Sequence, residues 1–319
     1  MLTCRAFGAA ALCLLVTAPL ARGAQQPPLT HWRQRSSLAL DQTSRRAQRT
    51  RQGPQPRGYA VTKLREFPHE GKPWTQGLEF AADGRLIETS GDYPAGTGSF
   101  VRVVDRQTGA TIQSITDGVS STFLEGIVEL NGRWFATTYL DHQVLELNQN
   151  LELQGTHPYP FEGWGFTRSH DNTSFLATNG SQWVMTFNAS TYEVLSTSPA
   201  TCLGRNVMGI NELEMVDDFL GHGPALLGNL MSSRLVLVMD PATFQCTGAF
   251  HLEDLEPVRT DEFGGFHVAN GIAYDPRSDT FVVTGKNWDS MFEIRVGENA
   301  SSPQPAHAIE LLERYLNIS

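Results

Sequence analysis

Five copies of one strand–turn–strand pattern constrain this chain more than any other feature. Each copy opens with a polar or aromatic residue before a small apolar segment, and the five openings are Gln76-Gly77-Leu78, Glu125-Gly126-Ile127, Trp164-Gly165-Phe166, Asn211-Glu212-Leu213 and Asn270-Gly271-Ile272. Self-similarity at a period of about 40–55 residues in segments that favour strands is typical of propellers, with one repeat per blade. The sequence therefore predicts an all-β, five-bladed β-propeller over residues 59–296.

The opening residues of the repeats are the first candidates for a functional site. In a propeller the innermost strand of each blade lines the central channel, so these five residues should converge on one axis. The alternative is that they only fill the channel or cap strands. Glu125 is the one carboxylate at these positions, and a desolvated carboxylate in a narrow channel is costly without a function.

The remaining segments predict a processed, secreted chain. Residues 1–24 combine Arg5, an apolar stretch and a small-residue cleavage site, as a signal peptide does. Residues 25–58 contain seven Arg and one Asp and lack apolar periodicity, which predicts a disordered leader or propeptide. Residues 297–319 read as a tail with a short helix. The net charge of −10 argues against nucleic acid as a partner, and no later segment predicts a membrane span.

Cysteines and glycosylation motifs support the secretory route. Cys4 and Cys13 fall in the predicted signal, so Cys202 and Cys246 remain as a predicted disulfide, with two buried free thiols as the alternative. Five Asn-x-Ser/Thr motifs begin at Asn172, Asn179, Asn188, Asn299 and Asn317. We expect glycosylation at the first four and a location in the secretory pathway or outside the cell.

No metal or cofactor signature is visible in the sequence. The nine His residues lack the spacing of a zinc motif. Neither a Gly-x-Ser-x-Gly elbow nor a reactive-cysteine context is present. The sequence therefore predicts no metal and no cofactor, and leaves acid–base chemistry by one carboxylate.

Six motifs resemble those of a known family. They read Trp74-Thr-Gln-Gly-Leu-Glu-Phe80, Phe123-Leu-Glu-Gly-Ile127, Glu162-Gly-Trp-Gly-Phe166, Ile210-Asn-Glu-Leu-Glu214, Asn270-Gly-Ile-Ala-Tyr-Asp275 and Val283-Thr-Gly-Lys-Asn-Trp288. Together and in this order they resemble the plant and bacterial type of glutaminyl-peptide cyclotransferase, a metal-independent acyltransferase with a five-bladed propeller. The resemblance runs over about residues 59–296.

The resemblance implies a function and a set of site residues. It implies cyclisation of N-terminal Gln of peptides or proteins to pyroglutamate with release of ammonia, by a monomer. Glu125 would be the catalytic acid–base, and the substrate pocket would comprise Gln76, Trp74, Phe123, Tyr139, Trp164, Asn211, Met231 and Lys286. Trp74, Tyr139 and Met231 depart from the family pattern, and only Met231 removes an aromatic ring.

Two other functions remain open at this point. A propeller that has lost one aromatic wall could grip a peptide N-terminus or another ligand without catalysis. A calcium-dependent, lactonase-like propeller would require several acidic or amide side chains around the axis, where the motifs supply only Glu125, Asn211 and Asn270. Dependence on a metal would separate this last function from the other two.

Overall fold

A computed structural model describes residues 55–93, 96–253, 255, 268–299 and 301–318. The chain divides into two units, Met1–Arg51 and Gln52–Ser319, and every described residue belongs to the second. The predicted signal peptide and residues 25–54 of the predicted leader lie outside the described residues. No helix within the described part is long and apolar enough to cross a membrane.

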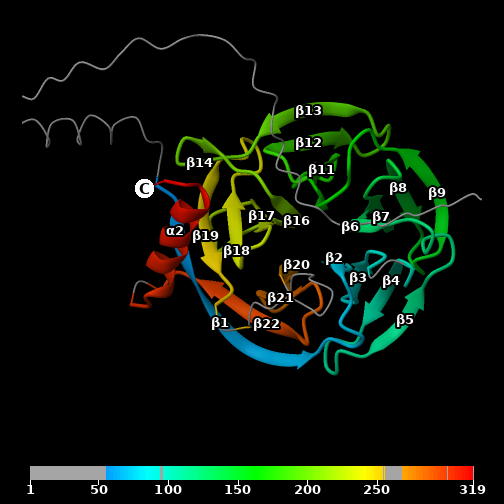
Figure 1. Cartoon of the computed structure of the whole chain (residues 1–319), viewed down its shortest axis with the longest axis horizontal. Helices are drawn as coiled ribbons and strands as arrows, with labels where there is room; N and C mark the ends of the chain where they lie inside the picture. The colour runs from blue at the N-terminus through cyan, green and yellow to red at the C-terminus, as the bar shows by residue number, and fades with distance from the viewer. Residues whose placement is uncertain (1–54, 94–95, 254, 256–267, 300, 319) are drawn as a thin grey trace, which may run out of the picture. The chain divides into compact units, whose positions relative to one another are not determined.

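The described unit is nearly all β (Figure 1). Three four-stranded antiparallel sheets each consist of consecutive strands. They are β2 (Thr75–Phe80), β3 (Leu86–Ser90), β4 (Phe100–Val104) and β5 (Thr111–Ile115); β6 (Leu124–Leu130), β7 (Arg133–Thr138), β8 (Gln143–Leu147) and β9 (Leu153–Pro158); and β10 (Phe166–Arg168), β11 (Ser174–Thr178), β12 (Trp183–Asn188) and β13 (Val194–Pro199). Two short strands, β14 (Thr201–Cys202) and β15 (Arg205–Asn206), pair with each other.

An eight-stranded sheet contains the two ends of the described unit. One antiparallel half comprises β16 (Ile210–Val216), β17 (Ala225–Leu230), β18 (Leu235–Met239) and β19 (Cys246–His251), and the other comprises β20 (Ala269–Asp275), β21 (Thr280–Gly285) and β22 (Ser290–Gly297). The strand β1 (Arg57–Pro68) lies between the halves, parallel to β19 and antiparallel to β22. The N-terminal strand of the described unit therefore pairs with the last repeat.

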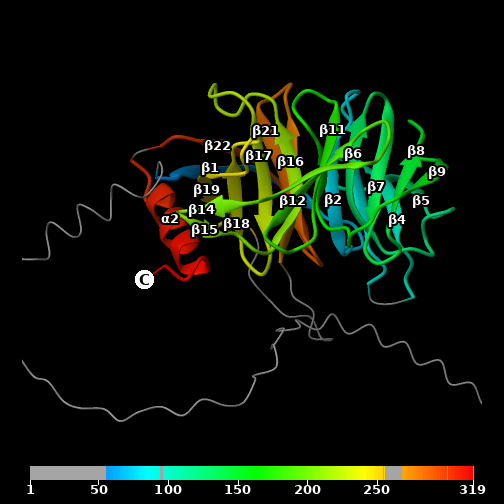
Figure 2. The same cartoon turned by 90° about the horizontal axis from the view of Figure 1, so that it is seen from above.

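The first strands of the five repeats contact one another in a closed cycle. β2 contacts β6, β6 contacts β10, β10 contacts β16, β16 contacts β20, and β20 returns to β2. Figure 1 shows β2, β6, β16 and β20 on the inner side of their sheets, with β5, β9 and β13 on the outer side, and Figure 2 shows the same unit from above. Apolar side chains pack between neighbouring sheets, as where Ile87 and Val101 meet Ile127 and Trp134.

Glycine explains the second position of the repeated motif. A Cβ atom on Gly126 would lie 2.5 Å from the backbone N of Phe166, and one on Gly165 would lie 1.9 Å from the carbonyl O of Asn211. Real Cβ atoms do not approach backbone so closely, so these inner strands can meet only where a side chain is missing. The close contact also lets the Gly126 N–H donate to the Trp164 carbonyl at 2.8 Å.

A second repeated feature is the turn before the outermost strand. In four repeats, one side-chain oxygen of an Asp or Asn accepts the backbone N–H groups of two residues that follow it closely in the chain. These four residues are Asp105, Asn148, Asn188 and Asp240. In such a turn the Asp or Asn side chain replaces a backbone acceptor. This explains why an Asp or Asn recurs at the same position of four repeats.

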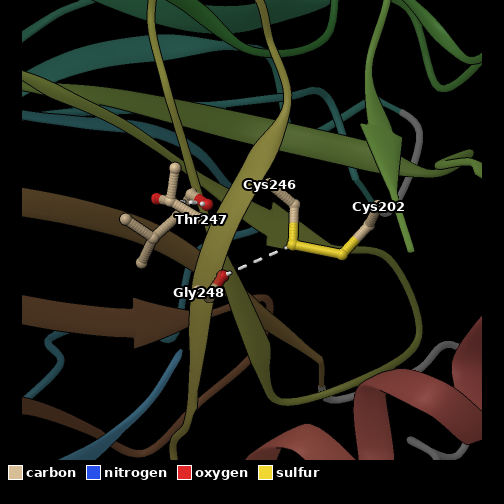
Figure 3. Close-up of a disulfide and its surroundings, with 5 residues drawn as sticks. Cys202, Cys246, Thr247 and Gly248 are labelled. Atoms are coloured by element: carbon tan, nitrogen blue, oxygen red, sulfur yellow. Dashed lines mark hydrogen bonds between the residues drawn. A yellow bond between two sulfur atoms is a disulfide. The ribbon is translucent and has the colours of Figure 1, made fainter. Parts of the chain in front are cut away.

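A disulfide and a helix cover the outside of β19. Cys202 of β14 is bonded to Cys246 of β19, as Figure 3 shows. The helix α2 (Gln304–Tyr315) packs on β1, β18 and β19 and buries Leu312. A Cβ atom on Gly58 of β1 would lie 1.8 Å from the Pro305 carbonyl O, so the start of the helix rests directly on this strand.

We predict that Gly165→Ala strongly destabilises the protein. The added methyl group would collide with backbone of the next inner strand, which cannot move as a flexible side chain can. We expect a loss of about 3 kcal/mol in the free energy of unfolding, and a melting temperature lower by roughly 5–10 °C. The matched control is Gly155→Ala on β9, where no atom lies within 4 Å of the new methyl group. Equal melting temperatures for the two variants would contradict this account.

Candidate active site

The inner strands begin at one end of the ring, where Glu125 lies. The Gln76 side-chain amide donates to Glu125 Oε1 at 3.1 Å. The Asn270 side-chain amide donates to the Thr75 carbonyl at 2.9 Å and contacts Gln76 Oε1 at 3.4 Å. Glu125 is 4% exposed and Gln76 is 2% exposed. Three of the five repeats therefore contribute a polar group to one small buried cluster.

The electrostatics of Glu125 are dominated by burial. Desolvation raises the pKa of Glu125 well above its ordinary value, the positive charge of Lys286 opposes this, and the exposed Glu162 adds to it. Burial likewise lowers the pKa of Lys286 to about 8, against the opposing influence of Glu125. Burial therefore drives both groups towards their neutral forms, as is common for side chains that bind and release protons at functional sites.

Aromatic side chains stand beside this cluster. The Lys286 Nζ atom lies 5.2 Å from the centre of the Trp74 ring. Trp74 packs against Tyr93 with ring centres 3.9 Å apart and ring planes tilted by 36°, and Phe123 packs against Tyr139 at 5.7 Å. The predicted residues Trp74, Phe123 and Tyr139 are all partly exposed. Tyr93 was missed, because it lies in a loop outside the repeated motifs.

Three further predicted residues, Trp164, Asn211 and Met231, belong to the next repeats. Trp164 is partly exposed, and its carbonyl accepts from the residue that follows Glu125. Asn211 is buried, and among the described residues its Oδ1 atom meets no hydrogen-bond donor. Met231 donates through its N–H to the Gly209 carbonyl, and Gly209 in turn donates to Gly180, which packs on the Trp164 ring. Met231 is thus linked to the site through Trp164.

A hydrogen-bonded network holds the start of β2 in place. Glu88 accepts from the Thr75 hydroxyl at 2.6 Å, from Arg102 Nε at 2.7 Å, and lies 2.9 Å from His69 Nε2. Burial alone would raise the pKa of Glu88, but Arg102 and His69 overcome it and lower the pKa to about 2. Glu88 is therefore a buried anion whose desolvation is offset by its ion pair and hydrogen bonds with Arg102, His69 and Thr75. It fixes Thr75, the neighbour of Gln76, and the sequence motifs did not reveal it.

The inner strands carry a second buried carboxylate near their starts, at the second position of the fourth motif. Glu212 is also buried, and it accepts from the Ile272 N–H at 3.0 Å and the Leu78 N–H at 3.5 Å. Glu212 stands where the other four motifs have glycine. Burial raises its pKa well above the ordinary value. Since both oxygens bind backbone of neighbouring inner strands, we assign Glu212 a structural role.

The other end of the inner strands is a different environment. A cavity of about 810 Å³ opens there, lined among others by Glu79, Glu129, Arg168, Glu214 and Asp217. Burial raises the pKa values of both Glu79 and Glu214, which share a hydrogen bond. Glu125 does not line this cavity, so the Gln76–Glu125 cluster and the cavity are separate.

Comparison with known proteins decides the family. The family model for glutamine cyclotransferases matches residues 35–296. The chain belongs to the glutamine cyclotransferase family. A glutaminyl-peptide cyclotransferase from Arabidopsis thaliana is 25% identical over 273 residues, which are 84% of this chain and 78% of that protein. The crystal structure of the Myxococcus xanthus glutaminyl cyclase matches with a TM-score of 0.65 at 24% identity, covering 76% of this chain and 99% of that one. The resemblance drawn from the six motifs is thus confirmed.

For this glutamine cyclotransferase we predict that Gly91→Ala impairs substrate binding without unfolding the protein. A Cβ atom on Gly91 would lie 2.2 Å from the Phe123 ring, so the ring must turn away from its present position beside Tyr139. Misplacing a group that orients substrate costs up to about 10²-fold in rate. We expect KM for short Gln-initiated peptides to rise roughly 10-fold, with Gly155→Ala as the matched control. An unchanged KM would show that Phe123 does not contact the substrate.

Proposed function

We propose that this protein converts the N-terminal Gln of peptides or proteins to pyroglutamate and releases ammonia, with Glu125 as the group that transfers protons. Family membership supports the reaction. The observation that carries the assignment of Glu125 is its burial between Gln76, which donates to it, and the charge of Lys286. A carboxylate held in this way has a raised proton affinity and a fixed orientation.

The reaction needs one proton to move twice. The α-amino nitrogen of the substrate attacks the carbon of its own side-chain amide, and the new C–N bond closes a five-membered ring. Glu125 takes a proton from the attacking nitrogen and returns it to the amide nitrogen, which leaves as ammonia when its C–N bond breaks. A single positioned carboxylate performs both steps. An α-amine with a pKa of about 7.7 is partly neutral near pH 7, so it requires little activation.

The neighbours of Glu125 supply the remaining contributions. Negative charge develops on the amide oxygen of the substrate as the ring closes, and donors aimed at that oxygen stabilise the transition state. The side chains of Gln76, Asn211 and Lys286 are the candidates for these donors. Trp74, Phe123, Tyr139, Trp164 and Met231 would enclose the rest of the N-terminal residue and exclude water. Holding the substrate in the attacking geometry supplies much of the acceleration.

The wider setting of the enzyme is also a proposal. The five antiparallel groups of strands and their cyclic contacts support a five-bladed propeller closed by β1. The disulfide and the predicted signal peptide favour secretion. Of the four predicted glycosylation sites, Asn172 and Asn299 are exposed and Asn179 and Asn188 are partly exposed. Because Asn179 precedes Gly180, which packs on Trp164, a glycan there would stand near the rim of the site. We propose that a monomer acts on peptides.

The other functions receive less support. Family membership does not favour a propeller that only binds peptide N-termini. A calcium-dependent lactonase-like site would need acidic groups open to a cation near the axis. Glu212 does not meet that need, since both of its oxygens accept backbone N–H groups. In the cavity at the other end of the inner strands, Glu79 and Glu214 share a hydrogen bond, and burial, which raises the pKa of both, disfavours the anionic forms that Ca²⁺ requires.

We predict that Glu125→Gln lowers kcat by about 10²-fold or more and leaves the melting temperature nearly unchanged, because the two side chains have the same shape but Gln cannot transfer the proton. Ammonia release from a Gln-initiated peptide measures kcat. The matched control is Glu129→Gln, at the other end of the same strand β6. Its amide oxygen can still accept the Ala82 N–H that Glu129 accepts. Near-normal turnover by Glu125→Gln would show that Glu125 is structural.

A further inference from the structure

Three potential metal ligands from two elements meet on the outside of the described unit. His251 ends β19, Glu253 follows two residues later, and His307 lies in the first half of α2. One ligand atom from each of the three side chains lies within 4.8 Å of the others, and all three residues are partly exposed. The His251 and His307 rings meet edge to face, with centres 5.8 Å apart.

We infer that His251, Glu253 and His307 form a binding site for a zinc-class divalent cation. Two imidazoles and one carboxylate are a donor set that suits Zn²⁺. Bonds of about 2.0–2.2 Å to one tetrahedral ion would place the ligand atoms about 3.4 Å apart. The present separation is therefore larger by about 1 Å, which small rotations of partly exposed side chains can close. The remaining coordination position is left for water.

The surroundings favour a cation over an accidental pairing of histidines. His307 Nδ1 lies 3.8 Å from Glu310 Oε2, and Glu310 is also paired with Arg314. A carboxylate beside the second nitrogen of a metal-bound imidazole fixes its orientation and increases its basicity. The other imidazole–carboxylate contacts of the described residues, such as His222 with Glu298, supply one histidine each.

A metal at this position would fasten the C-terminal helix to the sheet. α2 already touches β1 through Pro305 and Gly58, and the Tyr315 hydroxyl donates to the Met208 carbonyl at 3.0 Å. The cation would add metal–ligand bonds to the existing packing of α2 on β19. His307 lies beyond residues 35–296, which the family model matches. The site therefore needs one residue from outside the matched region, and none of its three ligands belongs to the Gln76–Glu125 cluster.

The test is zinc binding by the purified full-length protein after treatment with a chelator and dialysis. Mass spectrometry of the bound metal and calorimetric titration with ZnCl₂ should give one zinc per chain. Cobalt substitution should give the visible absorption of a tetrahedral site. At a free zinc concentration about 100 times Kd, the melting temperature should rise on the order of 5 °C, whereas MgCl₂ should not raise it.

His251→Asn and His307→Asn should each abolish the stoichiometric zinc and the rise in melting temperature. The matched control is His222→Asn, because His222 contacts a carboxylate, Glu298, but no second histidine. This variant should retain both the stoichiometric zinc and the rise in melting temperature. The metal-free melting temperatures of all variants check that they fold. Cyclisation by the metal-free wild type should match that of the zinc-loaded protein. The proposal is overturned if the wild type binds no stoichiometric zinc, or if both substitutions leave binding unchanged.

Discussion

The close approach of the inner strands is the constraint on which the site depends. Gly126 and Gly165 have no side chain where the next strand passes, so backbone meets backbone around the axis. Gly77 does the same between β2 and β6, where a Cβ atom would lie 2.6 Å from the Ile127 N atom, and this approach brings Gln76 within hydrogen-bonding distance of Glu125. It also removes water from the carboxyl group, and that removal raises the pKa of Glu125. Fold and chemistry therefore share one cause: the repeated glycine.

Two buried acids close to the start of the inner strands illustrate how their surroundings set different roles. Glu88 is compensated by Arg102 and His69, and its lowered pKa keeps it ionised as a fixed anchor. Glu125 has one amide donor and the more distant charge of Lys286, so burial prevails and its pKa rises. A group that must gain and lose a proton in each turnover needs an environment like that of Glu125, in which its pKa is raised.

The sequence predicted those features that recur with a period. Repetition placed Gln76, Glu125, Trp164 and Asn211 at equivalent positions, and the structure brings their strands together around one axis. The expected pairing of Cys202 with Cys246 had no support from spacing, yet the structure contains that disulfide.

The features that could not be predicted from the sequence depend on contacts between segments that share no sequence motif or repeat. In the sequence, Glu212 is only the second residue of the fourth motif. The structure shows that its carboxyl group accepts backbone N–H groups from β2 and β20. His251 and His307 are separated by a long stretch of chain, so no ligand spacing could reveal them. Tyr93 reaches Trp74 from a loop, where neither periodicity nor motif constrains position.

The most direct test of the central claim is the pH dependence of kcat/KM for one Gln-initiated peptide in the wild type and in Lys286→Met. Activity should rise with pH as Glu125 loses its proton and becomes able to accept one from the substrate. The charge of Lys286 lowers the pKa of Glu125, so its removal should move this rise to higher pH. The contribution from the substrate's own α-amine should stay in place. A rise that remains at the same pH, or moves to lower pH, would contradict the account.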